Sequence, residues 1–209
     1  MSNRKKRAAV IRDALDGRSI VMVGMMGCGK SAIGKRLAQA LDLPFVDADE
    51  EIEKAAGKSI AEIFAEHGEP HFRDGERKVI ARLLGGGPQV LATGGGAFME
   101  PRTRAAVRTH GVSVWLNADI EVLIRRVARR DNRPLLKATD PARKMRELLE
   151  QRTPFYAEAD LTIESRDVAH DTIIDEIIQV LATGPALLHA DRRSEPSDSQ
   201  DRPIAAGDS

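Results

Sequence analysis

Short apolar runs alternate with longer amphipathic segments along most of the chain. The apolar runs have the length of buried strands, and we predict strands at residues 19–23, 44–46, 89–93, 112–116 and 161–163. The longer segments carry apolar residues at helical spacing, and we predict helices at residues 30–42, 49–56, 59–67, 72–84, 101–109, 119–130, 143–158 and 168–182. Strands separated by helical segments indicate an α/β fold with a parallel, doubly wound sheet.

The two ends of the chain differ from this pattern. Residues 8–17 predict a short amphipathic helix ending at Gly17, and we treat residues 1–17 as an N-terminal extension without an assigned role. From Gly184 onward the chain is rich in Asp, Arg, Ser and Pro and has few large apolar side chains. We therefore expect one domain over residues 18–183 and a disordered tail over 184–209.

The first predicted strand leads directly into a glycine-rich loop, residues 24–31, with the sequence Gly-Met-Met-Gly-Cys-Gly-Lys-Ser. A strand, this loop and a helix in that order form the setting of a phosphate-binding loop, whose backbone N–H groups turn toward a polyphosphate. Lys30 would reach the β- and γ-phosphates, and the Ser31 hydroxyl would ligate Mg²⁺. The loop predicts a nucleoside triphosphate site that includes Gly27, Cys28, Gly29, Lys30, Ser31 and Ala32.

Asp47 and Asp49 follow the second predicted strand, at the sheet edge where open α/β folds bind ligands. In an extended segment, residues two apart point to the same side, so we expect both carboxylates to face the phosphates. One would reach Mg²⁺, directly or through water, and the other would orient or deprotonate a substrate hydroxyl. The alternative is that Asp49 only caps the following helix.

Two further features fall at the same edge of the sheet. Gly94, Gly95 and Gly96 follow the third predicted strand, where a ligand would take hydrogen bonds from the main chain; a plain flexible turn is the alternative.

Five arginines lie at the end of the helix after the fourth strand and in the next loop, and two or three of them only complement the helix C-terminus. We expect Arg133 to stabilise the transferring phosphoryl group. The five arginines are Arg125, Arg126, Arg129, Arg130 and Arg133.

The composition limits the classes of partner that this protein is expected to bind. The formal net charge is zero, so bulk electrostatics indicate neither nucleic acid nor a membrane surface, and no apolar stretch approaches the length of a spanning helix. Cys28 is the only cysteine, which fits a reducing cytosol, and we interpret it as a small spacer in the loop. Aromatic residues make up only 3% of the chain, which disfavours a stacked nucleobase as the phosphoryl acceptor.

Several motifs in order resemble those of the shikimate kinase family, over about residues 19–165. They are G-M-M-G-C-G-K-S at 24–31, F-V-D-A-D at 45–49, G-E-x-x-F-R at 68–73, T-G-G-G at 93–96, R-P-L-L at 133–136 and Q-R-x-P-x-Y at 151–156. The phosphate-binding loop is shared by many families, whereas the whole series is far more specific. The resemblance implies a P-loop fold of the nucleoside monophosphate kinase type, with three layers, a five-stranded parallel sheet, a substrate subdomain at about 48–76 and a lid at about 130–142.

The resemblance also implies roles for individual residues. The reaction would move the γ-phosphoryl of MgATP to the 3-hydroxyl of shikimate, with Asp49 orienting the nucleophile and Arg73 and Arg152 holding the carboxylate. The triple glycine would line the same pocket. Lys30, Ser31 and Asp47 would serve the phosphates and Mg²⁺, Arg133 would arrive from the lid, Arg126 would pack on adenine and Glu76 would support Arg73. We expect a cytoplasmic monomer with shikimate and MgATP as its partners.

Two other functions stay open at this point. One is a gluconate kinase or another small-molecule kinase of the same fold, because gluconate is also a polyhydroxy acid. The triple glycine and the pair Arg73 and Arg152 favour shikimate. The other is a protein that binds ATP without transferring a phosphoryl group; the presence of Lys30, Asp49 and Arg133 gives no sign of lost catalysis.

Overall fold

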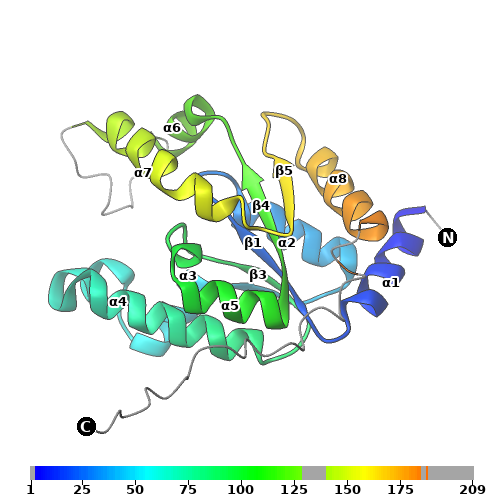
Figure 1. The fold of residues 1–209 in the computed structure, drawn as a ribbon, viewed down its shortest axis with the longest axis horizontal. Coiled ribbons are helices and arrows are strands. Elements are labelled where there is room, and N and C mark those ends of the chain that lie inside the picture. Colours follow the sequence, from blue (N-terminus) through cyan, green and yellow to red (C-terminus); the bar gives the residue numbers. More distant parts are fainter. Residues whose placement is uncertain (1–2, 129–139, 185–186, 188–209) are drawn as a thin grey trace, which may run out of the picture.

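A five-stranded parallel sheet forms the centre of the protein, with the strand order β2-β3-β1-β4-β5 (Figure 1). The computed structural model describes residues 3–128, 140–184 and 187. Every residue of β1 is buried, as expected for a strand covered by helices on both faces. The predicted strands are confirmed, with shifts of at most one residue at their ends. Their bounds are β1 Ser19–Val23, β2 Phe45–Asp47, β3 Val90–Ala92, β4 Gly111–Asn117 and β5 Leu161–Glu164.

Helices cover both faces of this sheet. α2 contacts β1, β2 and β3, and α8 contacts α2 and β5, whereas α5 packs on β4 and α4 packs on α5. The predicted three-layer doubly wound architecture is therefore confirmed. The helices are α1 Asn3–Leu15, α2 Lys30–Leu41, α3 Ala48–Ala56, α4 Ile60–Leu84, α5 Pro101–His110, α6 Ile120–Ala128, α7 Pro141–Tyr156 and α8 His170–Thr183, with a 3₁₀ turn, η1, at Ala97–Met99.

The two helices predicted at 59–67 and 72–84 form one kinked element, α4. Gly68 interrupts the helical backbone with φ 78° and ψ 175°, just before Pro70. The Ser59 side chain and Glu62 form a capping box at the start of the element. α3 and the first part of α4 enclose a small core of their own around Ile52, Ile63 and Phe72, which makes the predicted substrate subdomain a distinct packing unit.

The N-terminal extension is part of the packed domain. α1 lies beside α8 and α2 (Figure 1), with Ala8, Ile11 and Leu15 buried. The Arg18 side chain links the end of α1 to Leu187, since it donates hydrogen bonds to the carbonyls of Leu15 and Leu187. Leu187 is itself 5% exposed. The boundaries expected at 17 and 184 therefore fall inside the packed unit. At 17 the reason is the packing of α1 on α8 and α2, and at 184 it is the burial of Leu187 in the hydrophobic core.

We expect Ile11→Ala to destabilise the protein by about 2–5 kcal/mol, the usual range for truncating a buried isoleucine. Ile11 is 0% exposed, whereas its neighbour Val10 is 54% exposed. Urea unfolding followed by circular dichroism measures the loss, and Val10→Ala on the same helix is the matched control. An equal, small effect of the two substitutions would mean that α1 does not contribute to the cooperative unit.

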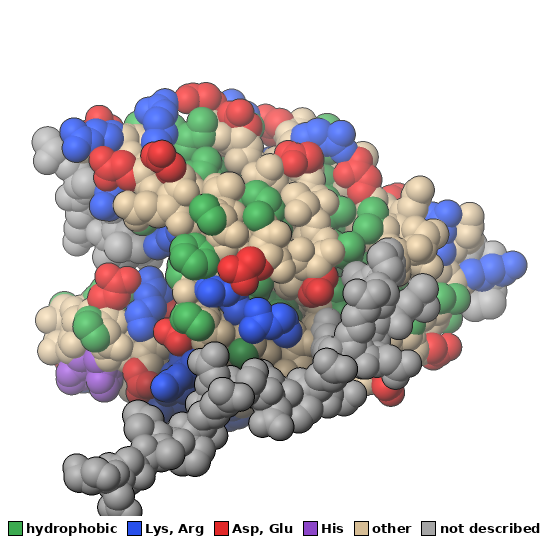
Figure 2. Space-filling model, viewed as in Figure 1, with side chains coloured by type: hydrophobic (Ala, Val, Ile, Leu, Met, Phe, Trp, Pro, Cys, Tyr) green, Lys and Arg blue, Asp and Glu red, His purple; other side chains and the backbone are tan. Residues whose placement is uncertain are grey.

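Acidic and basic side chains are interspersed over the face shown in Figure 2, in keeping with a net charge of zero. Within residues 3–128, 140–184 and 187, no helix combines the length and the apolar character needed to cross a bilayer.

Candidate active site

The phosphate-binding loop joins β1 to α2 at the carboxyl edge of the sheet. Gly29 is the N-cap of α2 and has φ 102°, a left-handed conformation that glycine adopts without strain. The start of a helix presents free N–H groups and a partial positive charge, which suit a phosphate. The Lys30 side chain is buried against the loop, and its Nζ donates to the carbonyls of Gly24 and Met25 at 2.8 and 3.0 Å.

A cavity of about 380 Å³ opens over this loop. Five residues predicted to bind the nucleotide line it with Arg126: Gly27, Gly29, Lys30, Ser31 and Ala32. Cys28 is buried and does not line the cavity; its carbonyl accepts a hydrogen bond from the Ser165 hydroxyl at 2.7 Å. The spacer interpretation of Cys28 thus fits its place in the loop, which is fastened to the segment after β5.

Asp47 and Asp49 both line this cavity, but the reason expected from the sequence is wrong. The backbone is not extended through this pair, because β2 ends at Asp47 and α3 begins at Ala48. Asp47, rather than Asp49, caps α3, with its Oδ1 accepting from the backbone N–H of Asp49 at 3.1 Å. Its Oδ2 accepts from the Ser31 hydroxyl at 2.6 Å. Asp49 lies in the first turn of α3.

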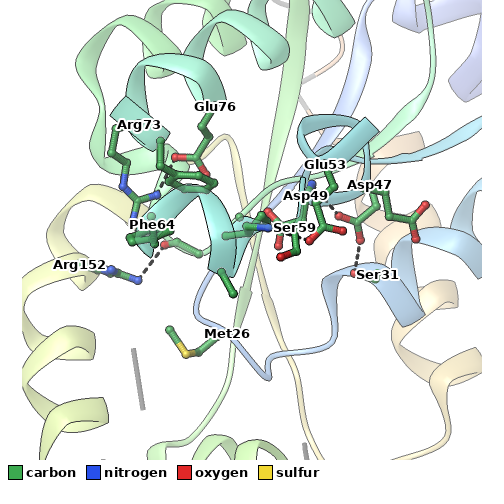
Figure 3. A pocket seen from close by; sticks show the side chains of 17 residues that line it. Met26, Ser31, Asp47, Asp49, Glu53, Ser59, Phe64, Arg73, Glu76 and Arg152 are labelled. Atoms are coloured by element: carbon green, nitrogen blue, oxygen red, sulfur yellow. Dashed lines mark hydrogen bonds and ion pairs between the residues drawn. The ribbon is translucent and has the colours of Figure 1, made fainter. Parts of the chain in front are cut away.

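A second cavity, of about 440 Å³, lies between the sheet edge and the subdomain formed by α3 and α4 (Figure 3). It has apolar walls from Met26, Phe64 and Phe72, and its polar groups include two arginines and several carboxylates. Arg73 comes from α4 and Arg152 from α7, so two elements far apart in sequence bring guanidinium groups to one cavity. The polar lining consists of Ser31, Asp47, Asp49, Glu50, Glu53, Ser59, Arg73, Glu76 and Arg152.

Two carboxylates hold Arg73: Glu69 Oε1 accepts from its Nε and Nη2 at 3.2 and 3.0 Å, and Glu76 accepts from its Nη1. The more buried of the two is Glu76. The carboxylate is 3% exposed, and its Oε2 accepts a hydrogen bond from Arg73 Nη1 at 2.6 Å. Burial raises the pKa of the Glu76 carboxyl above its ordinary value, and this effect outweighs the attraction of Arg73. The pair therefore places a guanidinium at the cavity wall with a buried carboxyl beside it, the contact that the family resemblance implied for Glu76.

Glycine is needed at positions 94 and 96 because charged side chains lie so close to the backbone that a Cβ atom would clash with them. A Cβ on Gly96 would lie 2.6 Å from both terminal nitrogens of Arg73, and a Cβ on Gly94 would lie 2.6 Å from Glu76 Oε1. Arg152 Nη1 donates to the Gly95 carbonyl at 3.2 Å. The close approach is thus made by the binding-site side chains themselves, which the sequence could not show.

We expect Gly96→Ala to raise the KM of the acceptor by about 10-fold or more, because the methyl group displaces the Arg73 guanidinium and weakens a charge-assisted contact. Steady-state kinetics with each substrate varied in turn measure this effect. Gly75→Ala on α4 is the control, since a Cβ there meets no heavy atom within 4 Å. Unchanged acceptor kinetics in a folded Gly96→Ala protein would show that the arginine does not need its observed position.

The two cavities share one wall, made by Ser31, Asp47, Asp49, Gly94 and Gly95. The first cavity suits an anionic polyphosphate at a helix N-terminus. The second suits a small polar molecule with a carboxylate, because paired guanidinium groups bind that group well. A phosphoryl group held in the first cavity would meet an acceptor held in the second at Asp49. The arrangement is that of a small-molecule kinase.

The comparison with protein families decides among such kinases, since a family model described as shikimate kinase matches residues 26–182. The chain belongs to the shikimate kinase family. A shikimate kinase of Bradyrhizobium diazoefficiens is 62% identical over 173 residues, 83% of this chain and 84% of that protein. One of Rhodopseudomonas palustris is 56% identical over 180 residues, 86% of this chain and 89% of that protein.

Solved structures agree with this assignment. The shikimate kinase of Acinetobacter baumannii in complex with shikimate superposes with a TM-score of 0.78 at 37% identity, covering 82% of this chain and 96% of that chain. The resemblance expected from the motifs is confirmed, and so is the P-loop kinase fold. As a member of the shikimate kinase family, the chain is an ATP-dependent kinase.

Some features of this shikimate kinase family member were not predicted. The segment after β5 and the start of α8 line the cavity over the phosphate-binding loop through Ser165, Arg166, Asp167, Val168, His170 and Ile173. Ligands bind beyond the carboxyl ends of parallel strands, and this rule applies to β5 as well. Applied to the predicted strand at 161–163, it would have indicated the residues that follow it as part of the site. Arg126 lies on this side, donating to the Ser165 hydroxyl and the Arg166 carbonyl, both at 3.1 Å.

Most of the predicted lid lies outside the described residues. This applies to Arg133, together with the rest of the segment from 129 to 139. At its other end the expected lid reaches 142, but α7 begins at Pro141 with Asp140 as its N-cap. Pro141 occupies the first helical position, which favours proline, so the helix starts two residues earlier than predicted and runs from Pro141 to Tyr156 rather than from 143 to 158.

Proposed function

We propose that the protein transfers the γ-phosphoryl group of MgATP to the 3-hydroxyl of shikimate, producing 3-phosphoshikimate and ADP on the route to chorismate. The observation that carries the proposal is the wall shared by the two cavities, with Asp49 between a phosphate-binding loop and a pocket bearing two arginines. Shikimate is a small ring with three hydroxyls and one carboxylate, and this pocket has a partner for each kind of group.

On the acceptor side, Arg73 and Arg152 bind the carboxylate, and Asp49 accepts a hydrogen bond from the nucleophilic hydroxyl. A carboxylate beside the hydroxyl orients it and can take its proton as the O–P bond forms. Gly94, Gly95 and Gly96 supply main-chain polar groups along the same wall. Glu76 acts through Arg73, which it holds in place.

On the nucleotide side, Lys30 and the N-terminus of α2 receive the phosphates of ATP. The hydroxyl of Ser31 and the carboxylate of Asp47 are hard oxygen ligands 2.6 Å apart, the donor type that Mg²⁺ prefers. These two residues would hold the ion directly or through water, and a bound Mg²⁺ would neutralise part of the phosphate charge. Arg126 contacts the nucleobase side of the cavity, and Arg133 stabilises the transferring group.

We further propose that the protein works as a cytoplasmic monomer. Its lone cysteine is buried in the phosphate-binding loop, so no intrachain disulfide contributes to stability. Both cavities are built by a single chain, so catalysis does not require a second copy. Light scattering after size exclusion tests the oligomeric state, and a dimer at micromolar concentration would contradict this part of the proposal.

A coupled ADP-release assay tests the function. Purified protein with MgATP is given shikimate, gluconate, a set of nucleoside monophosphates or no acceptor, and we expect turnover with shikimate alone. Turnover with gluconate instead would move the assignment to another kinase of the same fold. ATP binding without turnover on any acceptor would favour the non-catalytic alternative.

A further inference from the structure

The tyrosine of the Q-R-x-P-x-Y motif, Tyr156, has no part in the function proposed above. Its side chain is 0% exposed, and its ring stacks on that of Trp115 at 5.9 Å with an interplanar angle of 28°. Its hydroxyl donates a hydrogen bond to the Gly95 carbonyl at 2.5 Å. The ring is thus fixed by packing, and the hydroxyl is aimed at the middle residue of the triple glycine.

Arg152 shares this acceptor. It lies four residues before Tyr156 on α7, which places both side chains on the same face of the helix. Its Nη1 donates to the same Gly95 carbonyl at 3.2 Å. One carbonyl of the cavity wall therefore takes hydrogen bonds both from an arginine of the acceptor pocket and from a buried phenol.

The other end of this turn is held independently. Arg104 of α5 donates to the carbonyls of Phe98 and Met99, both at 2.9 Å. Backbone hydrogen bonds also hold the peptides on either side, since the carbonyls of Gly94 and Gly96 accept from the N–H groups of Ala97 and Met99 at 3.2 and 3.0 Å. The peptide between Gly95 and Gly96 has no side chain of its own to anchor it. Because a peptide unit is planar, fixing the Gly95 carbonyl also fixes the N–H of Gly96 on its opposite side.

We propose that Tyr156 is a positioning residue for the acceptor pocket: by holding the Gly95 carbonyl, it fixes the Gly95–Gly96 peptide and leaves Arg152 able to turn toward the substrate carboxylate. The proposal rests on the proposed function of that pocket. Without the phenol, Arg152 would have to abandon a partly buried carbonyl when it binds the carboxylate, and an unpaired buried polar group is costly. With the phenol in place, that carbonyl stays paired throughout.

The chemistry of the phenol suits this role. Burial raises the pKa of the Tyr156 hydroxyl above its ordinary value, so the group remains a protonated donor at any pH where the enzyme works. The stacked Trp115 is the only tryptophan of the chain. Replacing the tyrosine by phenylalanine would keep the ring and this contact while removing only the hydroxyl.

Tyr156→Phe is the direct test. Losing one hydrogen bond to the wall should raise both the KM and the calorimetric Kd of shikimate by about 3- to 10-fold. The KM of ATP should change less than about 2-fold, because Tyr156 does not line the nucleotide cavity. Wild-type protein is measured in the same series to separate the test of the proposed function from the test of Tyr156. Failure of the wild type to bind or phosphorylate shikimate would count against the proposed function, whereas a change in the variant alone concerns Tyr156.

Ser113→Ala is the matched control. Its hydroxyl is also buried and donates to Asp160 Oδ2 at 2.7 Å, but Ser113 lines neither of the two cavities. We expect a comparable loss of Tm with unchanged KM values. Tyr156→Phe would overturn the proposal if shikimate binding stayed unchanged, if the KM of both substrates rose in parallel, or if the variant failed to fold, since the hydroxyl would then serve the fold rather than the pocket.

A double-mutant cycle tests the path of the effect. In an Arg152→Lys background the guanidinium that competes for the Gly95 carbonyl is gone, so Tyr156→Phe should raise the Kd of shikimate by a clearly smaller factor than in the wild-type background, because only the fixing of the Gly95–Gly96 peptide is then lost. An effect as large as in the wild type would mean that the phenol acts without Arg152, which contradicts the proposed route.

Discussion

Asp49→Asn is expected to lower kcat with shikimate by at least about 100-fold, the usual contribution of a general acid–base group. The amide keeps the size of the side chain but cannot take a proton, and it offers a weaker acceptor to the nucleophilic hydroxyl. Asp49 is half-buried in the first turn of α3, where Asp47 already caps the helix, so the fold should survive. Single-turnover measurement of phosphoryl transfer at saturating MgATP and shikimate isolates the chemical step.

Asp42→Asn controls for the general effect of removing a carboxylate. Asp42 is exposed at the C-cap of α2 with φ 54°, a conformation that asparagine also adopts. We expect normal turnover from this variant. A folded Asp49→Asn protein with near-normal turnover would remove Asp49 from the mechanism and leave positioning alone to account for the reaction.

Arg73→Ala is expected to lower kcat/KM for shikimate on the order of 100-fold or more while leaving ATP binding nearly unchanged. In the proposed function the guanidinium binds the substrate carboxylate, and in the structure it pairs with Glu76; truncating one member of such a charge pair costs about 2–5 kcal/mol. Steady-state kinetics give the acceptor effect, and titration with ATP gives the nucleotide affinity. Equal weakening of both ligands would point to a structural role only.

The same substitution should also destabilise the fold, because it leaves the Glu76 carboxylate buried without its cation. The pKa of Glu76 is raised in the folded protein, so the stability linked to its protonated form is present below the ordinary carboxyl pKa and is lost as pH rises through the raised one. Removing Arg73 takes away an attraction that lowers this pKa, so the pKa of Glu76 rises further in the variant. We therefore expect the stability deficit of Arg73→Ala to be larger at pH 8 than at pH 5.

Arg73→Ala/Glu76→Gln separates the two roles of Arg73. The neutral amide removes the buried charge, so the double variant should regain most of the stability and lose the pH dependence of the deficit. Binding of shikimate should not recover, because the guanidinium is still missing. Recovery of activity along with stability would show that the single substitution acted only through the fold.

The sequence predicted the fold because its local signals agree with one another. The buried run at 19–23, the glycine-rich loop and the amphipathic segment after it specify a β-loop-α unit before any tertiary contact is known. α1 was placed too short and outside the domain because its apolar positions make sense only against α8 and α2, which lie far along the chain.

Site residues that directly follow a strand could be predicted from the sequence. Contacts that depend on how distant helices pack together could not. Asp47, Asp49 and the triple glycine were found from their positions, whereas the sharing of Gly95 by Arg152 and Tyr156 depends on how α7 docks on the turn after β3. The reason for placing Asp49 was wrong, because the capping interaction of Asp47 starts α3 one residue earlier than periodicity indicates.

The position of the phosphate on the product tests the central claim most directly. Protein incubated with MgATP and shikimate is analysed by proton–phosphorus correlation spectroscopy, which identifies the ring carbon that carries the new phosphomonoester. If Arg73 and Arg152 hold the carboxylate and Asp49 selects the nucleophile, the phosphate will be found on the 3-hydroxyl alone. A phosphate on another hydroxyl, or ADP formed without any phosphorylated shikimate, would contradict the account.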